Sequence, residues 1–271
     1  MKVVKIIGLF GLFCISFFYT EKVINVTLNQ DEIMVRIKEY SQEYNTNPSD
    51  AIIKKDTIIP GNVGKYIDNE ASYKAMKKIG YFEPSLLIYK DIYPEISIYN
   101  NYNKYVTRGN IKNKKISLIY ILNNNNTIDN ILNITYKYKF KMNFFIDSAF
   151  LNNNINLIDK IKDNEIYSYG NNGMYTKDNL IITNNIINNK ANNKAIYCLF
   201  LKRDEQSLNS CANSKMLSVL VDKNSNYQNF KDKIDNGYIL LINNTQELAN
   251  TAEYIMSKGY IIVPLSELIT E

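Results

Sequence analysis

Strand-like apolar runs alternate with helical patterns over the C-terminal part of the chain, and this alternation constrains the fold more than any other feature. The apolar runs are residues 116–121, 142–146, 165–169, 195–201, 216–221, 238–242 and 260–263. The helical patterns are residues 127–138, 156–162, 176–189, 207–211, 227–234, 246–257 and 265–269. This order favours a parallel sheet covered by helices. It predicts an α/β fold with roughly seven β-α units, a small barrel, with a doubly wound open sheet as the alternative.

The N-terminus carries the pattern of a membrane or export segment. Lys2 and Lys5 precede an apolar run at residues 6–19, which is short for a full span of about 20 residues. A positive flank on this side places the rest of the chain across the membrane. We expect an uncleaved signal anchor at residues 1–20, with a cleaved signal peptide and a buried core segment as alternatives. The first two predict a single-pass membrane protein with an extracytoplasmic C-terminal domain, or a secreted protein.

Two further segments separate this N-terminus from the regular pattern. Residues 21–56 read as a stalk, because residues 31–44 have apolar side chains at helical spacing and residues 45–50 then interrupt them. Residues 57–110 read as a small leader module, with a short helix that Gly80 ends. The predicted α/β domain covers residues 112–271.

The composition excludes several classes of function. The chain has no histidine, which removes Ser-His-Asp and Cys-His pairs and every metal site that contains histidine. The net charge is +5, but the excess is scattered lysine, and the arginines are only Arg36, Arg108 and Arg203. A nucleic-acid reader usually concentrates its basic residues and uses arginine at base edges, so we expect no nucleic-acid partner.

Three cysteines occur, and Cys14 lies in the N-terminal apolar run. The other two, Cys198 and Cys211, lie 13 residues apart in the part of the chain predicted to be exported. Disulfides persist outside the cytoplasm, so one disulfide between them is the expectation. Two buried free thiols are the alternative, since free cysteine is often buried.

Several segments together resemble the motifs of one known family. Residues 116–125 (ISLIYILNNN) correspond to a first strand followed by Thr-Phe-Asp-Asp-Gly, and residues 142–146 (MNFFI) to Ala-Thr-Phe-Phe-Val. Residues 163–170 (DNEIYSYG) correspond to Gly-His-Glu-Ile-Gly-Asn-His. Residues 236–243 and 258–268 correspond to the late strand and the Lys-Gly-Tyr ending. Over residues 112–271 the chain resembles the polysaccharide deacetylase (NodB-homology) family. Residues 57–110 look like the leader module that envelope-anchored members of this family carry.

The resemblance implies a fold and a chemistry. The fold would be a distorted (β/α)7 barrel. Members remove acetyl groups from N-acetylated sugars such as chitin oligomers or peptidoglycan, which is hydrolysis of a non-peptide C–N bond. An Asp-His-His set holds zinc or another divalent metal that activates water. A second Asp acts as general base, and a late His donates a proton to the leaving amine.

This chain departs from the family at each of those positions. The Asp-Asp pair falls on Ile121 and Leu122, the two metal histidines fall on Tyr169 and Gly173, and the late histidine falls on Asn243. Aliphatic side chains offer no lone pair, and Tyr and Asn are poor ligands for a hydrolytic zinc. We therefore expect no catalytic residues, no metal and no cofactor, and interpret the chain as a catalytically inactive pseudoenzyme.

A degenerate barrel of this kind could keep a glycan-binding cleft. Aromatic faces stack on sugar rings, and amide side chains bind hydroxyl groups. The candidate cleft residues are Tyr120, Asn123, Asp147, Tyr167, Tyr169 and Asn243. The expected partner is cell-wall glycan or an envelope protein.

Two alternatives remain open at this point. Asp147 could join Asp163 or Glu165 in a carboxylate-only site for a hard cation, which would make the protein an active hydrolase. Alternatively, a cleft plugged around Ile121 and Leu122 would leave a purely structural surface protein.

Overall fold

The computed structural model describes residues 12–20, 29–123, 128–222, 231 and 233–271. The chain forms two compact units. Unit 1 comprises Met1–Pro48 and Val63–Tyr93, and unit 2 comprises Ser49–Asn62 and Pro94–Glu271. The expected stalk (residues 21–56) and leader module (residues 57–110) are therefore each divided between the two units, because the chain enters unit 2, leaves it and returns.

Residues 12–20 are helical. In the part of the chain that the structure describes, no helix combines the length and the apolar character needed to cross a bilayer. Residues 1–11 of the predicted anchor lie outside the described residues, as do most residues of the helix expected at 227–234.

Unit 1 is a small module of helices and one two-stranded sheet. Its elements are α2 (Glu32–Tyr44), β3 (Gly64–Ile67), α3 (Asn69–Met76), the 3-10 helix η1 (Pro84–Leu86) and β4 (Tyr89–Ile92). Carboxylates begin both α-helices: Asp31 accepts a hydrogen bond from the Ile33 N–H, and Asp68 accepts one from the Ala71 N–H, both at 3.0 Å. The antiparallel pair β3–β4 and the helices bury a small apolar core of Met34, Ile37, Ile67, Tyr73, Met76 and Leu87.

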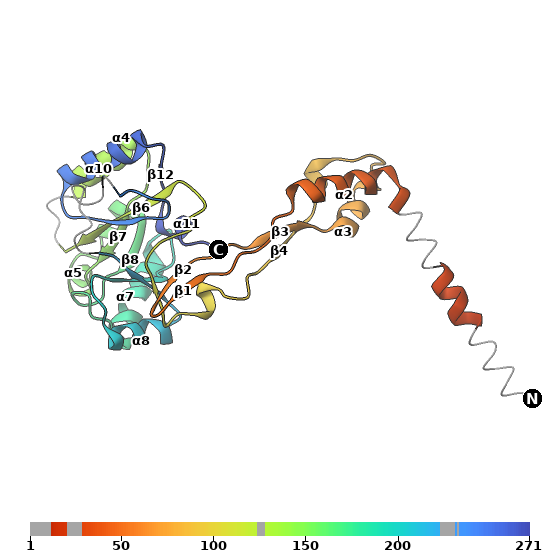
Figure 1. Cartoon of the computed structure of the whole chain (residues 1–271). Helices are drawn as coiled ribbons and strands as arrows, with labels where there is room; N and C mark the ends of the chain where they lie inside the picture. The colour runs from red at the N-terminus through yellow and green to blue at the C-terminus, as the bar shows by residue number, and fades with distance from the viewer. Residues whose placement is uncertain (1–11, 21–28, 124–127, 223–230, 232) are drawn as a thin grey trace, which may run out of the picture. The chain divides into compact units, whose positions relative to one another are not determined.

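Unit 2 contains a large, curled sheet (Figure 1). Its strands are β1 (Ile52–Lys54), β2 (Thr57–Ile59), β5 (Tyr105–Val106), β6 (Lys115–Leu122), β7 (Asn143–Ile146), β8 (Glu165–Ser168), β9 (Tyr197–Phe200), β10 (Leu217–Leu220), β11 (Ile239–Ile242) and β12 (Ile261–Ile262). They run in the order β1-β2-β5-β10-β9-β8-β7-β6-β11, with β12 also paired to β6. All pairs except β1–β2 are parallel.

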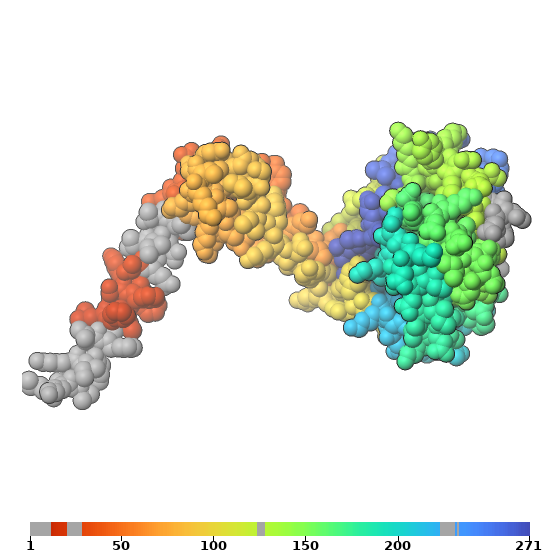
Figure 2. Space-filling model, turned by 180° about the vertical axis from the view of Figure 1, so that it is seen from behind, coloured from red at the N-terminus to blue at the C-terminus, as the bar shows by residue number. Residues whose placement is uncertain are grey.

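Helices follow the strands as the sequence pattern predicts. They are α4 (Ile128–Tyr138), α5 (Ser148–Asn153), α6 (Leu157–Ile161), α7 (Lys177–Lys190), α8 (Glu205–Asn213), α10 (Thr245–Ser257) and α11 (Leu265–Leu268), with the 3-10 helix η2 (Ile98–Asn100) before them. In Figure 2 the green-to-cyan part of the chain, which contains α4 to α8, covers the face of unit 2 turned to the viewer. The prediction of a mixed α/β fold with a parallel sheet is confirmed.

The predicted closed barrel is corrected to a half-barrel. Strands β6 to β10 lie side by side in chain order, so the sheet winds in one direction and is not the doubly wound alternative. Among the described strands, however, β11 at one end does not pair with β1 at the other. The reason is that β5 pairs with β10, and β5 and the hairpin β1–β2 continue the sheet outward from it.

Each central strand contributes to two cores, because successive side chains point to opposite faces. On β6, Leu118, Tyr120 and Leu122 join the core beneath α4 and α10. Ile119 joins the core on the inner side of the sheet, which also holds Phe145 and Tyr167. Both faces are apolar, as expected for a parallel sheet covered on both sides.

Strands β8 and β9 are joined mainly by hydrogen bonds from side chains rather than by a ladder of backbone hydrogen bonds. The two strands share a single residue pair, Ser168 with Cys198. The Asn193 amide accepts from the Ile166 N–H and donates to the Ile166 carbonyl, both at 2.9 Å. The Tyr175 hydroxyl accepts from the Leu199 N–H at 2.8 Å and lies within donating distance of the Ser168 and Leu199 carbonyls, at 3.0 and 3.1 Å. Buried backbone groups are thereby satisfied.

A disulfide joins β9 to the helix that follows it. The sulfur atoms of Cys198 and Cys211 are bonded, and both residues are fully buried. The Cys198 sulfur lies 4.0 Å from that of Met216. The disulfide therefore holds α8 against the sheet, next to the place where β8 and β9 meet.

Three tyrosines make the fold sensitive to alkaline pH. Burial raises the pKa of Tyr167, Tyr175 and Tyr197 above the ordinary value of 10.0. The unfolded chain therefore releases these protons first, and the free energy of unfolding falls as the pH rises above about 10. The exposed tyrosines ionise first, and the last part of the phenolate absorbance should rise together with the loss of circular dichroism. The chain has no Trp, so tyrosine dominates this spectrum. Full phenolate formation with the fold intact would contradict this expectation.

Candidate functional site

The carboxyl ends of the parallel strands meet at one edge of the half-barrel, where barrel enzymes usually place their active sites. We call this region the carboxyl edge. It holds the residues that follow β6, β7, β8, β9 and β11, which are Asn123, Asp147, Tyr169, Leu201 and Asn243. Of the positions that the resemblance singles out, Tyr169 and Asn243 directly follow strands at this edge, and Ile121 and Leu122 end β6 beside it.

The end of β6 shows which motif positions face the interior. Ile121 is half-buried and packs against the inner core, whereas Leu122 is fully buried in the core beneath the helices. Tyr120 also belongs to the helix-covered core, and its ring lies edge-on to Phe144 with centroids 6.4 Å apart. The prediction that Tyr120 lines a glycan cleft is therefore wrong.

Tyr169 and Gly173, the positions that the resemblance assigns to metal ligands, lie against each other. Gly173 has a positive φ of 81°, and a Cβ built there would lie 3.1 Å from the Tyr169 hydroxyl oxygen. The phenol thus occupies the space that a side chain at position 173 would need. Burial and the nearby Asp147 carboxylate raise the pKa of Tyr169, so its hydroxyl stays protonated and is a poor metal ligand.

Asp147 uses both carboxylate oxygens to hold the backbone. Its Oδ1 accepts from the Ala149 and Phe150 N–H groups at 2.9 and 3.1 Å and so begins α5. Its Oδ2 accepts from the Asn172 N–H at 2.7 Å. This carboxylate therefore positions the loop that carries Gly173 and acts as a helix cap.

The carboxylate cluster considered as an alternative metal site does not form. Glu165 begins β8 and Asp163 precedes that strand, so both lie at the opposite end of the sheet from Asp147. Glu165 is buried and accepts hydrogen bonds from the Tyr167 hydroxyl at 2.6 Å and the Ser266 N–H at 3.1 Å. Within the described ranges, no three Asp, Glu, Cys or His side chains gather as a metal site would require.

The remaining predicted cleft residues divide between the core and the carboxyl edge. Tyr167 is 1 % exposed and lies in the inner core, so its place in an open cleft is wrong. Asn123 and Asn243 are both exposed at strand ends. The Asn243 N–H donates to Glu247 Oε2 at 3.1 Å at the start of α10.

A pocket of about 410 Å³ opens at the carboxyl edge between the ends of β8 and β9. Its lining residues are Tyr169, Asn172, Gly173, Met174, Phe200, Leu201, Lys202 and Asp204. Sequence reasoning found Tyr169 and Gly173 but missed the others. The available signal was the carboxyl end of the strand expected at 195–201, since that end must lie beside the preceding strand's end.

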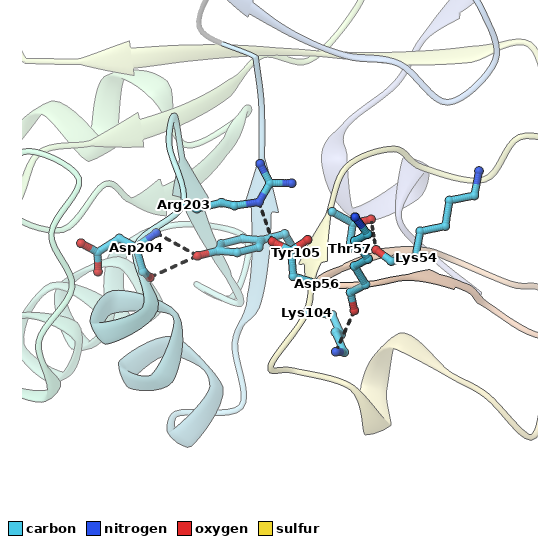
Figure 3. Close-up of polar contacts among 8 residues, drawn as sticks. Lys54, Asp56, Thr57, Lys104, Tyr105, Arg203 and Asp204 are labelled. Carbon is cyan, nitrogen blue, oxygen red and sulfur yellow. Dashed lines mark hydrogen bonds and ion pairs between the residues drawn. The ribbon is translucent and has the colours of Figure 1, made fainter.

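Polar contacts hold the β9 side of this pocket in place (Figure 3). Asp204 begins α8 by accepting from the Ser207 N–H at 2.7 Å, and these Ser207 contacts hold the pKa of Asp204 below its usual value. The Tyr105 hydroxyl accepts from the Asp204 N–H at 2.9 Å and donates to the Asp204 carbonyl at 3.1 Å. The side chain of Arg203 runs past this tyrosine, and its Nε donates to Asp56.

No protein-family model matches the chain. A 140-residue stretch is 29 % identical to YlxY of Bacillus subtilis, an uncharacterized protein. The match covers 51 % of this chain and 44 % of that protein, so the chain spans less than half of this curated relative.

Solved structures decide the fold. Wild-type BA3943 of Bacillus anthracis, described as a pseudoenzyme of carbohydrate esterase family 4 (CE4), is 23 % identical, with a TM-score of 0.62, over 89 % of this chain and 96 % of that one. The fold is that of the CE4 proteins. A BA3943 mutant described as having restored enzymatic activity has a TM-score of 0.63 at 22 % identity, over 89 % of this chain and 99 % of that one. Bacillus subtilis PdaA, a CE4 member, is 17 % identical, with a TM-score of 0.51, over 63 % of this chain and 86 % of that one.

Proposed function

We propose that this protein is a catalytically inactive CE4-type protein that binds cell-wall glycan through the pocket at the carboxyl edge. We further propose that residues 1–20 attach it to the membrane and that the rest of the chain lies outside the cytoplasm. The main support is the combination of an open pocket with motif positions that cannot hold a metal. Likeness to a CE4 pseudoenzyme supports the same conclusion.

The residues at this edge offer little for hydrolysis. A metal-dependent deacetylase needs a bound cation with an open position to activate water. Here Ile121 replaces a carboxylate, the Tyr169 phenol fills the space beside Gly173, and Asp147 is occupied by three N–H groups. The side chains that line the pocket therefore support glycan binding rather than hydrolysis.

The pocket has the mixed lining that a sugar requires. Met174, Phe200 and Tyr169 supply apolar and aromatic surface, and Asn172, Lys202 and Asp204 supply polar groups. Carbohydrate sites commonly combine such surfaces, because sugar rings have an apolar face and a polar rim. Met174 is 61 % exposed at this pocket, which makes it a suitable position to test without disturbing the core.

Met174→Ala should weaken binding of an N-acetylglucosamine oligomer by about tenfold, since losing a contact of about 1.4 kcal/mol changes the Kd by that factor. Met256→Ala is the matched control, because Met256 is also exposed but lies on α10 outside the pocket lining. Titration calorimetry with both variants measures the effect, and an acetate assay on the same samples measures turnover. Equal affinities would contradict the assignment of the pocket, and acetate release by the wild type would contradict inactivity.

A structural role is the second candidate, and the contact between Tyr169 and Gly173 favours it. If the phenol also blocks ligand entry, the wild type should bind no glycan, while Tyr169→Ala should bind. Binding by the wild type would exclude this candidate.

A further inference from the structure

Unit 1 ends its second helix in a turn whose side chains point into solvent. The turn follows α3 and comprises residues 77–81, all of which are exposed. Ile79 is 42 % exposed and Tyr81 is 58 % exposed. Single exposed apolar side chains are common on a protein surface, but here an aliphatic and an aromatic side chain share one five-residue turn.

The backbone of this turn is fixed rather than loose. The N–H groups of Ile79 and Gly80 both donate to the Met76 carbonyl at 3.0 Å. Gly80 has a positive φ of 82°, as at many helix ends. A Cβ built at Gly80 would meet no atom within 4 Å, so the tip of the turn stands clear of the rest of the unit.

The residue after the turn explains why Tyr81 stays outside. Phe82 packs inward against Tyr40, with ring centroids 5.3 Å apart, and the Arg36 guanidinium lies 5.8 Å above its ring. Tyr81 therefore faces away from the core that its neighbour joins. In Figure 2 the amber part of unit 1, which includes α3, lies at the surface.

The turn itself carries two positive charges, at Lys77 and Lys78, and no acidic residue. Lys78 has no ion-pair or hydrogen-bond partner among the described side chains, and the same holds for Lys74. Lys77 donates to the Tyr73 hydroxyl at 2.9 Å, which in turn donates to Asp31 at 2.9 Å. The other acids near this stretch in sequence are Glu70, on α3, and Glu83, which caps η1.

We propose that this turn inserts into the headgroup region of an anionic lipid bilayer. A tyrosine and an aliphatic side chain flanked by lysines suit that interface, because the rings and chains enter the boundary while the ammonium groups meet anionic headgroups. The inference is strengthened by the proposed membrane attachment of residues 1–20. The chain from there to α2 could span at most about 40 Å, so the turn would act at high effective concentration.

The chain has no Trp, so Tyr81→Trp introduces a single reporter at the turn. Tyr136→Trp is the matched control, since Tyr136 is 86 % exposed in unit 2. The full chain of each variant is mixed with phosphatidylcholine vesicles containing 30 % phosphatidylglycerol, with and without brominated acyl chains. Flotation of the wild type with the same vesicles reports membrane attachment independently.

We expect the Tyr81→Trp indole to shift its emission to shorter wavelength and to be quenched by the brominated lipid, whereas the Tyr136→Trp indole remains in water. Lys78→Glu added to Tyr81→Trp should weaken this quenching about twofold or more. Equal behaviour of the two indoles would overturn the proposal even if the wild type floats. An indole at position 81 that is shielded from iodide but not reached by brominated lipid would also overturn it, because the turn would then contact protein.

Discussion

Tyr175→Phe is expected to lower the free energy of unfolding by about 3 kcal/mol. Its hydroxyl accepts from the Leu199 N–H and donates to a carbonyl of Ser168 or Leu199, at a place where β8 and β9 share a single residue pair. Removing that one oxygen leaves a buried N–H and a buried carbonyl without a partner, and each such group costs about 1–3 kcal/mol. Urea denaturation followed by circular dichroism measures the change.

Tyr169→Phe is the matched control for this substitution. Tyr169 lies six residues closer to the carboxyl end of β8 and lines the open pocket, where its hydroxyl is not part of the strand boundary. We expect its free energy of unfolding to change by less than about 0.5 kcal/mol. If both substitutions cost the same, the side-chain bridge between β8 and β9 does not contribute as described.

Removing the disulfide is expected to cost about 3 kcal/mol in the free energy of unfolding. Cys198 and Cys211 are separated by 13 residues, and closing a loop of this size removes chain entropy worth about that amount from the unfolded state. Because both residues are fully buried, Cys198→Ala with Cys211→Ala preserves most of the local volume. The denaturation midpoint of the oxidised protein, the reduced protein and the double variant measures the effect.

Cys14→Ser is the control for effects of the reducing agent on a thiol outside the disulfide, since Cys14 is the free cysteine. It should leave the midpoint unchanged. A reduced protein that unfolds at the same denaturant concentration as the oxidised one would contradict the predicted role of the bond.

The order of strands and helices in unit 2 could be predicted from the sequence because each element carries its own local signal. The runs at residues 116–121 and 142–146 are apolar over four or more residues and are followed by helical patterns, so neighbouring parallel strands were the direct expectation. Their pairing is found, with Ile119 opposite Asn143. In such a sheet the residues that follow the strands share one edge, and Asp147 and Tyr169 directly follow β7 and β8.

The orientation of side chains could not be predicted in the same way. In β6 both Ile119 and Tyr120 are buried, one on each face. A strand covered on both sides shows no alternation of polar and apolar residues, so nothing in the sequence distinguished the inner face from the outer one. This is why Tyr120 was wrongly assigned to a cleft, and why Tyr167 was expected in the open rather than in the core.

The prediction of a closed barrel was wrong for a different reason. The strands that continue the sheet past β10 are short and come from distant parts of the chain: Thr57 pairs with Tyr105, and Tyr105 pairs with Ser218. Local periodicity carries no information about pairings at such separations. The resemblance to the deacetylase family did not supply it either, since it covered residues 112–271.

The position of β5 also sets an order of events during synthesis. Strands β1 and β2 leave the ribosome early, but β5 has to settle on β10, whose residues emerge more than a hundred positions later. Unit 1 draws its core only from residues before 94, so it can fold while the rest of the chain is still being made. The hairpin β1–β2 must therefore wait with Ile58, which is buried in the finished core, still uncovered, and that interval is when a chaperone would be needed most.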